Sequence, residues 1–229
     1  MSLAADFEFD GGFIYTTFDS DNLNDVTEVT NNIYQALVNY IEDDPDYVLN
    51  DFDKMDDLDK ATGYWIGFRS DYFKNELGLD YEIGVRYETF SNDVEANLHT
   101  TNQNTSDSIK INTSLEVEVK GFAVNGERKI NDYIGITGTI GYYYGEISYL
   151  TDGEETLEGE TIDTEEGFSN DLEGGAGFKV GISTDFPISD NLDVIGNANY
   201  RILELDIEDS NESIDFDGWE LKGGLSYKF

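Results

Sequence analysis

The sequence lacks cysteine altogether and has only two prolines, two methionines and one histidine among its 229 residues. Without cysteine, the chain can form neither a disulfide framework nor a thiolate site. Basic residues are also scarce, because 13 Lys and Arg stand against 50 Asp and Glu, for a formal net charge of −37. A surface so acidic repels polyanions, so we expect no nucleic-acid partner. The sequence contains no run of apolar residues long enough for a transmembrane helix.

What the chain does have is glycine, tyrosine and phenylalanine, in segments where large apolar residues occupy every second position. Such alternation is typical of β-strands with two different faces. The segments cover residues 7–15, 64–72, 79–87, 109–119, 134–144, 172–186, 192–202 and 219–229. The pattern therefore predicts eight strands.

The connections between these segments alternate in length. Long ones are predicted at 19–60, 91–108, 151–171 and, more moderately, 208–215, and short ones at 74–76, 125–132 and 187–190. Long and short connections alternate when consecutive antiparallel strands run up and down, so that each kind leaves one rim. We therefore predict one domain over residues 1–229, an all-β, eight-stranded antiparallel up-and-down barrel with a long first loop at 19–60.

The alternation also indicates which face is which. The apolar face carries aromatic residues at both ends, which is typical of a barrel sitting in lipid with its polar face inward. One predicted girdle is Phe7, Phe9, Tyr72, Tyr81, Phe186, Tyr227 and Phe229; the other is Tyr15, Tyr64, Tyr87, Tyr142, Tyr144 and Trp219. Buried charges need partners, so we expect an interior ion-pair network of Glu8, Asp10, Arg69, Asp71, Glu82, Arg86, Glu88, Glu116, Glu118, Lys120, Lys179, Arg201, Glu220 and Lys222. The barrel is predicted to be transmembrane.

The last strand carries a more specific signal. It reads DGWELKGGLSYKF and places Trp219, Leu221, Leu225, Tyr227 and Phe229 on one face, with phenylalanine as the final residue. This strand resembles the C-terminal assembly signal of bacterial outer-membrane β-barrels, and the whole pattern is similar to the small OmpA/OmpX/OmpW-type barrels. The resemblance implies a Gram-negative outer membrane, lipid contacts, recognition of the last strand by the barrel-assembly machinery, and export with a signal peptide that this mature chain lacks. Both termini are then expected in the periplasm and the long loops outside.

The predicted first loop contains a helical pattern. Val26, Val29, Ile33, Leu37 and Tyr40 or Ile41 follow helical spacing, with Asp25 as a candidate cap and Glu28 at the capping-box position. The segment predicts a helix in the extracellular loop, which either packs on the barrel rim or serves as a lid, plug or partner-binding element.

Acidic runs in the loops, such as 42–46 and 51–59, leave divalent-cation binding open, although neither has the glycine of an EF-hand loop. A solvated surface suited to high salt explains them as well, which favours a halophilic source. The single histidine, His99, lies among Thr100, Thr101 and Ser106 without a nucleophile motif. We therefore expect no catalytic residues, no cofactor and no enzymatic activity.

These observations favour a non-enzymatic outer-membrane protein, a structural anchor or surface-binding module that presents acidic loops and has a polar, largely plugged interior. A narrow channel for small solutes or ions is an alternative, because inward-facing glycines such as Gly141 and Gly177 could leave space. A lipid-modifying or proteolytic barrel enzyme and a soluble acidic barrel are further alternatives.

Overall fold

The computed structural model describes residues 7–71, 81–105 and 107–229, so the predicted turn at 74–76 and the predicted girdle residue Tyr72 lie outside the described residues. The elements are β1 Phe7–Thr17, α1 Asp21–Asp43, β2 Tyr47–Asp53, β3 Lys60–Ser70, β4 Glu82–Asn102, β5 Ser108–Lys129, β6 Ile134–Leu157, β7 Glu160–Ser189, β8 Leu192–Ile202, β9 Glu204–Asp206, β10 Ser213–Asp215 and β11 Gly218–Lys228. Strands dominate, as the alternating pattern predicted.

Eight of these strands close into a ring. The order β4-β3-β1-β11-β8-β7-β6-β5 returns to β4 through a direct β4–β5 pairing, and every neighbour is antiparallel. The first and last strands pair along most of their length, from Glu8 opposite Lys228 to Thr16 opposite Glu220. A closed ring leaves no free edge at this level, because every strand has two neighbours. The predicted eight-stranded antiparallel barrel is confirmed.

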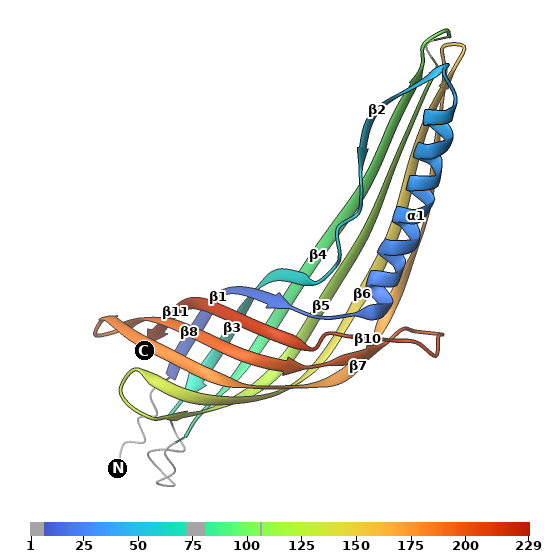
Figure 1. Ribbon diagram of the computed structural model, residues 1–229. Coiled ribbons are helices and arrows are strands. Elements are labelled where there is room, and N and C mark those ends of the chain that lie inside the picture. Colours follow the sequence, from blue (N-terminus) through green and yellow to red (C-terminus); the bar gives the residue numbers. More distant parts are fainter. Residues whose placement is uncertain (1–6, 72–80, 106) are drawn as a thin grey trace, which may run out of the picture.

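Four strands continue far beyond the ring, as Figure 1 shows for β4, β5, β6 and β7. They form a curved sheet that rises from one side of the barrel, at the end opposite Phe7 and Phe229. We call this sheet, together with α1 and β2, the extension, and the end near Phe7 and Phe229 the terminal rim. The loops predicted at 91–108 and 151–171 are therefore wrong for most of their length, because they are strands paired in continuous register.

The β6–β7 hairpin ends in a two-residue turn, Glu158 and Gly159, with φ of 51° and 85°. Positive φ at both positions matches the twist of the flanking strands, which is typical of tight hairpins. The predicted 21-residue loop is thus reduced to this turn. The polar residues of this segment led to the prediction of a loop. They form strands because both faces of this hairpin lie largely in water, where polar side chains are favoured.

The helix α1 lies along the extension and buries Leu23, Tyr34, Val38 and Ile41 against it. It begins at Asp21 after Ser20, so the predicted cap Asp25 is wrong and lies within the helix. The predicted stripe is only partly correct, because Val29, Ile33 and Tyr40 are exposed while Val26 and Leu37 are partly buried. The apolar residues of the helix extend around more of its surface than the sheet covers, so some of them stay exposed. Among the described residues, no helix combines the length and apolarity needed to cross a membrane.

The long strands change polarity where they leave the ring. In β5, Phe122 and Val124 point outward in the barrel, whereas Leu115, Val117 and Val119, on the opposite face, are buried in the extension. In β4, the inner face changes in the same way from Arg86 and Glu88 to Phe90, Val94, Ala96 and Leu98. The barrel is therefore polar inside and apolar outside, and the extension is apolar on its inner face and polar on its outer face.

Candidate functional site

The outer surface of the ring is an apolar belt. Aliphatic side chains such as Ile66, Val180 and Leu221 occupy its middle and are about half exposed. The described aromatic residues predicted for the two girdles point outward: Phe7, Phe9, Tyr81, Phe186, Tyr227 and Phe229 near the terminal rim, and Tyr15, Tyr64, Tyr142, Tyr144 and Trp219 near the extension. Tyr87 is partly covered because its ring lies against Phe122 at 5.2 Å. Exposed apolar surface this extensive marks a face made for an apolar environment.

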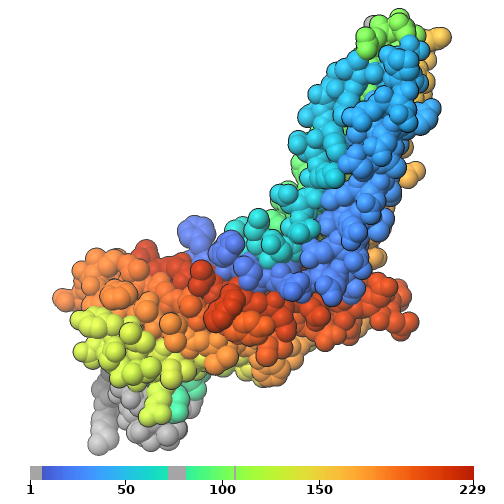
Figure 2. Space-filling view, in the orientation of Figure 1, coloured from blue at the N-terminus to red at the C-terminus, as the bar shows by residue number. Residues whose placement is uncertain are grey.

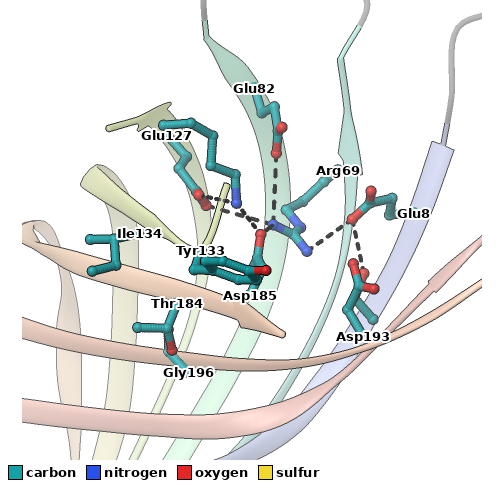
Figure 3. Close-up of polar contacts among 12 residues, drawn as sticks. Glu8, Arg69, Glu82, Glu127, Tyr133, Ile134, Thr184, Asp185, Asp193 and Gly196 are labelled. Atoms are coloured by element: carbon teal, nitrogen blue, oxygen red, sulfur yellow. Dashed lines mark hydrogen bonds and ion pairs between the residues drawn. The ribbon is translucent and has the colours of Figure 1, made fainter. Parts of the chain in front are cut away.

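Inside the ring, the first of two charged layers lies near the terminal rim and centres on Arg69 (Figure 3). The Arg69 guanidinium lies 2.9 Å from both Glu8 and Asp10, 3.8 Å from Glu82, 3.6 Å from Glu127 and 3.5 Å from Asp185. These carboxylates come from β1, β4, β5 and β7, so one planar cation joins distant parts of the ring. Lys129 supplies a second cation, 2.7 Å from Glu127 and in contact with Asp185.

The second layer lies deeper and centres on Glu88 and Glu220. Glu88 contacts the ammonium groups of both Lys179 and Lys222, and Glu220 lies 2.6 and 3.0 Å from the same two groups. Arg201 approaches Glu220 at 3.9 Å and donates a hydrogen bond from Nε to the Phe216 carbonyl at 2.8 Å. The charged side chains of this layer are at most 1% exposed. At this level of the ring the charged side chains are therefore closed to solvent.

Tyr143 completes this second layer, which we call the central layer. Its hydroxyl donates a hydrogen bond to Glu88 at 3.0 Å, and its ring lies in a socket formed by Gly121, Gly141 and Gly177. A Cβ atom at these glycines would stand 2.2, 2.6 and 2.7 Å from the ring. The inward-facing glycines at 141 and 177, which were a reason to consider a channel, therefore make room for an aromatic ring and not for water.

Apolar packing continues above the central layer. The Arg201 guanidinium lies 4.3 Å over the ring of Phe90, and Phe90, Leu203, Leu205 and Phe216 are all buried at the junction with the extension. Lower in the ring, Trp65 packs with Ile14 and Ile195 and is covered by Arg86 at 4.7 Å. The interior is thus filled by two charged layers and an apolar cap.

Most of the predicted network residues lie inside the ring or at its terminal rim, but three do not. Glu8, Asp10, Arg69, Glu82, Arg86, Glu88, Lys179, Arg201, Glu220 and Lys222 lie inside the ring, and Asp71 lies at the terminal rim. Glu116, Glu118 and Lys120 lie on the outer face of the extension instead, where Lys120 pairs with Glu118 at 2.5 Å. That part of the prediction is wrong, because the apolar residues of β5 lie on the outer face of the strand in the ring and on its inner face in the extension.

The predicted network omitted Glu127 and Lys129, and it also left out Asp185, although the alternation along 172–186 places Asp185 on the inner face. Glu127 and Asp185 tie Arg69 to the far side of the ring, and Lys129 pairs with both of them. The sequence did contain a signal for Glu127 and Lys129. The apolar residues of β5 move from odd positions, ending at Val119, to even positions, beginning at Phe122. That change of parity places Glu127 and Lys129, rather than Glu118 and Lys120, on the inside of the ring.

The C-terminal strand β11 joins the two ends of the barrel. It pairs with β1 on one side and β8 on the other, and Trp219, Leu221, Leu225, Tyr227 and Phe229 all point outward. The Phe229 amide donates a hydrogen bond to the Phe7 carbonyl at 3.1 Å. This strand closes the ring, and its apolar row lies on the outer surface of the barrel.

The surface of the extension is polar and strongly acidic. Among the described residues, no group of three His, Asp or Glu side chains is arranged to hold a metal ion, so cation binding at the acidic segments stays a prediction. His99 lies on the outer face of β4 opposite Asp51 of β2, and its predicted neighbour Ser106 lies outside the described residues. At the tip, Asp107 accepts hydrogen bonds from the Thr105 hydroxyl at 2.6 Å and the Glu158 amide at 2.9 Å, which lower the pKa of its carboxyl group.

No protein-family model and no curated protein matches this sequence. In structural comparison, the chain is similar to Ail of Yersinia pestis in complex with sucrose octasulfate, at 10% identity and a TM-score of 0.43 over 98% of this chain and 99% of that one. It is also similar to Neisserial surface protein A (13%, 0.42, 97% and 97%) and to the outer membrane protein OprG from Pseudomonas aeruginosa (13%, 0.46, 99% and 96%). The eight-stranded ring is established by the strand pairing of this chain itself.

Proposed function

We propose that this chain is a non-enzymatic bacterial outer-membrane protein whose barrel anchors an acidic, rigid extension at the cell surface. The observation that carries the proposal is the change of polarity along β4, β5 and β6. Within the ring the outward side chains are apolar, and beyond it they are Asp93, Glu116, Glu146 and similar residues. Both sets of outward side chains are favourably solvated only if the strand passes from an apolar medium around the ring into water around the extension.

Energetic considerations support this placement. Leaving a Phe, Leu or Ile side chain in water costs about 1.5–3 kcal/mol relative to burying it. The belt contains many such residues, and a closed ring leaves no backbone group without a partner in hydrocarbon. We infer that the membrane boundary crosses β5 between Phe122 and Lys120 and that the termini face the periplasm. The outward row of β11 is then the surface that the assembly machinery recognises.

The two tryptophans provide a direct test, because Trp219 points outward and Trp65 is fully buried inside the ring. In vesicles with brominated acyl chains, Trp65→Phe protein should show strong quenching of Trp219, and Trp219→Phe protein should show much weaker quenching of Trp65. Unboiled protein should also migrate differently from boiled protein in SDS. A folded monomer in buffer without detergent, with neither quenching nor a heat-dependent shift, would refute the proposal.

We further propose that the barrel serves as an anchor and not as a channel. The support is the inaccessible central layer around Glu88 together with the apolar cap above it. In planar bilayers, the refolded protein should give no reproducible unitary conductance. Steady unitary currents from protein that also shows the heat-dependent shift in SDS would support the channel alternative instead. Wild-type barrel reconstituted at the same protein-to-lipid ratio, but boiled beforehand, is the matched blank.

A further inference from the structure

Among the residues that the structure describes, one edge of the sheet in the extension has no strand beside it. The sheet there has the order β2-β4-β5-β6-β7, and β8 pairs with β7 only from Phe178 onward. The last links on that side are the Leu172–Ile207 bridge and a hydrogen bond of 2.9 Å from the Glu208 amide to the Asp171 carbonyl. Beyond them, residues 160–170 have β6 on one side and, within the described part of the chain, no strand on the other.

The groups presented at this edge follow from strand geometry. In an antiparallel strand the N–H and C=O of alternate residues point to the same side. Because the Asp171 carbonyl points to the open side, the same holds for the backbones of Ser169, Gly167, Glu165 and Asp163. The whole segment from Glu160 to Asp171 is exposed. It is therefore a ready template for one more strand.

Charge determines which strand this template can accept. On the outer face, Asp152 stands directly opposite Glu165, and Glu154 directly opposite Asp163. Like charges in such positions destabilise a sheet, and Lys110, 3.0 Å from Glu154, compensates only part of this charge. A second copy of this chain would bring more acid to the same place, whereas Lys or Arg side chains would relieve the repulsion.

The other face of the edge adjoins α1 and carries two apolar side chains among Thr164 and Glu166. Phe168 and Ile162 of β7 are exposed there, as are Val29 and Ile33 on the near flank of the helix. Tyr149 of β6 joins the two, because its hydroxyl lies 3.3 Å from the Thr30 hydroxyl and its ring stacks on Phe168 at 5.5 Å. Figure 2 shows β7, in orange, emerging along the side of the blue helix.

We propose that the free edge of β7 binds an extended cationic segment of another protein as an additional strand of the extension. Its basic side chains would lie over Asp152, Asp163 and Glu165, and its alternate apolar side chains would pack beside Phe168 and the exposed flank of α1. This inference rests on the proposed function, in that the extension must be displayed outside the membrane to meet such a partner. It names the chemistry of the partner of a surface-binding module.

The first experiment uses detergent-refolded full-length protein and a peptide of about ten alternating Lys and Val residues, a typical strand length. Saturable binding is expected, with strand-rich difference spectra and an affinity that falls as salt rises. An alternating Glu and Val peptide should not bind. A Lys–Val peptide that is N-methylated at every residue keeps its charge but has no N–H donor on either edge, and should bind about tenfold more weakly or worse.

Two substitutions at one position separate charge from strand addition. Glu165→Gln removes a carboxylate and should weaken binding a few-fold, whereas Glu165→Pro removes the same carboxylate and also the outward N–H. Proline is tolerated at a free edge, so both variants should retain the heat-dependent shift in SDS, and only the proline variant should lose a further tenfold.

Equal losses in both variants, or equal binding of the N-methylated peptide, would reduce the interaction to charge attraction and overturn the proposal. Concentration-dependent dimerisation that Glu165→Pro abolishes would show that the edge pairs with a second copy, which also overturns it. A protein that shows the heat-dependent shift but ignores the cationic peptide refutes this inference alone. Loss of the shift in the wild-type chain would refute the proposed function itself.

Discussion

The central charged layer predicts a large difference between two chemically identical substitutions. Glu88 neutralises Lys179 and Lys222, and Glu220 contacts the same two lysines and Arg201. Two carboxylates thus face three cations, and Glu88→Gln leaves one against three. Removing one partner of a buried pair exposes an uncompensated charge to a low dielectric and costs about 3–5 kcal/mol. We expect Glu88→Gln to lower the free energy of unfolding by that amount.

The matched control is Glu118→Gln. Glu118 also pairs with a lysine, Lys120 at 2.5 Å, but both side chains are more than a third exposed on the outer face of the extension. Exposed pairs contribute about 0–1 kcal/mol. Urea unfolding of both variants in lipid vesicles, followed by tryptophan fluorescence, gives the comparison directly. Similar losses for the two variants would show that the central layer is hydrated, which would contradict the plugged interior.

Three further predictions concern the ring and the extension. Gly177→Ala should destabilise the barrel by about 1–3 kcal/mol, because a Cβ there would stand 2.7 Å from the Tyr143 ring, whereas Gly138→Ala, with nothing within 4 Å, should be neutral in the same unfolding assay. Tyr34→Phe should cost about 1 kcal/mol, because the Tyr34 hydroxyl lies 2.9 Å from the Thr113 hydroxyl; hydrogen exchange in α1 should rise, unlike in Tyr40→Phe, whose side chain is exposed. At the tip, the lowered pKa of Asp107 means that its contacts stabilise the fold above the pKa of the unfolded chain and are lost as the pH falls through the folded pKa. The protection factor of the Glu158 amide, which compares its exchange rate with the intrinsic rate at the same pH, should therefore fall in acid. A protection factor that does not respond to acid, or that Asp107→Asn leaves unchanged at neutral pH, would contradict that contact.

How much the sequence could predict depends on the part of the chain. In β1, β3, β8 and β11 the large outward residues keep one parity along the whole strand, and the predicted outward and inward residues lie where they were expected. Those strands stay within the ring, so one face meets one environment along the whole length. In β4 to β7 the environment changes partway, and a single period cannot describe both halves. Glu116, Glu118 and Lys120 were assigned to the wrong face for this reason.

The helix shows a different limit. Spacing correctly predicted a helix in the first long connection, but several positions were compatible with its buried face. The sheet of the extension buries Leu23, Tyr34 and Val38 and leaves Val29, Ile33 and Tyr40 exposed. Helical periodicity gives an apolar arc, whereas the partner surface determines which part of that arc is covered.

By itself, the sequence determined the number of strands in the ring, their antiparallel order and the outward apolar row of the last strand, because a period of two and the spacing of turns are local properties. Only the tertiary structure decided that two predicted loops are strands, that Tyr143 fills the space left by Gly141 and Gly177, and that Arg69 meets Glu127 and Asp185 from across the ring. Those contacts join residues that are far apart in the sequence and meet only when the ring closes. Local patterning does not indicate which distant residues will meet.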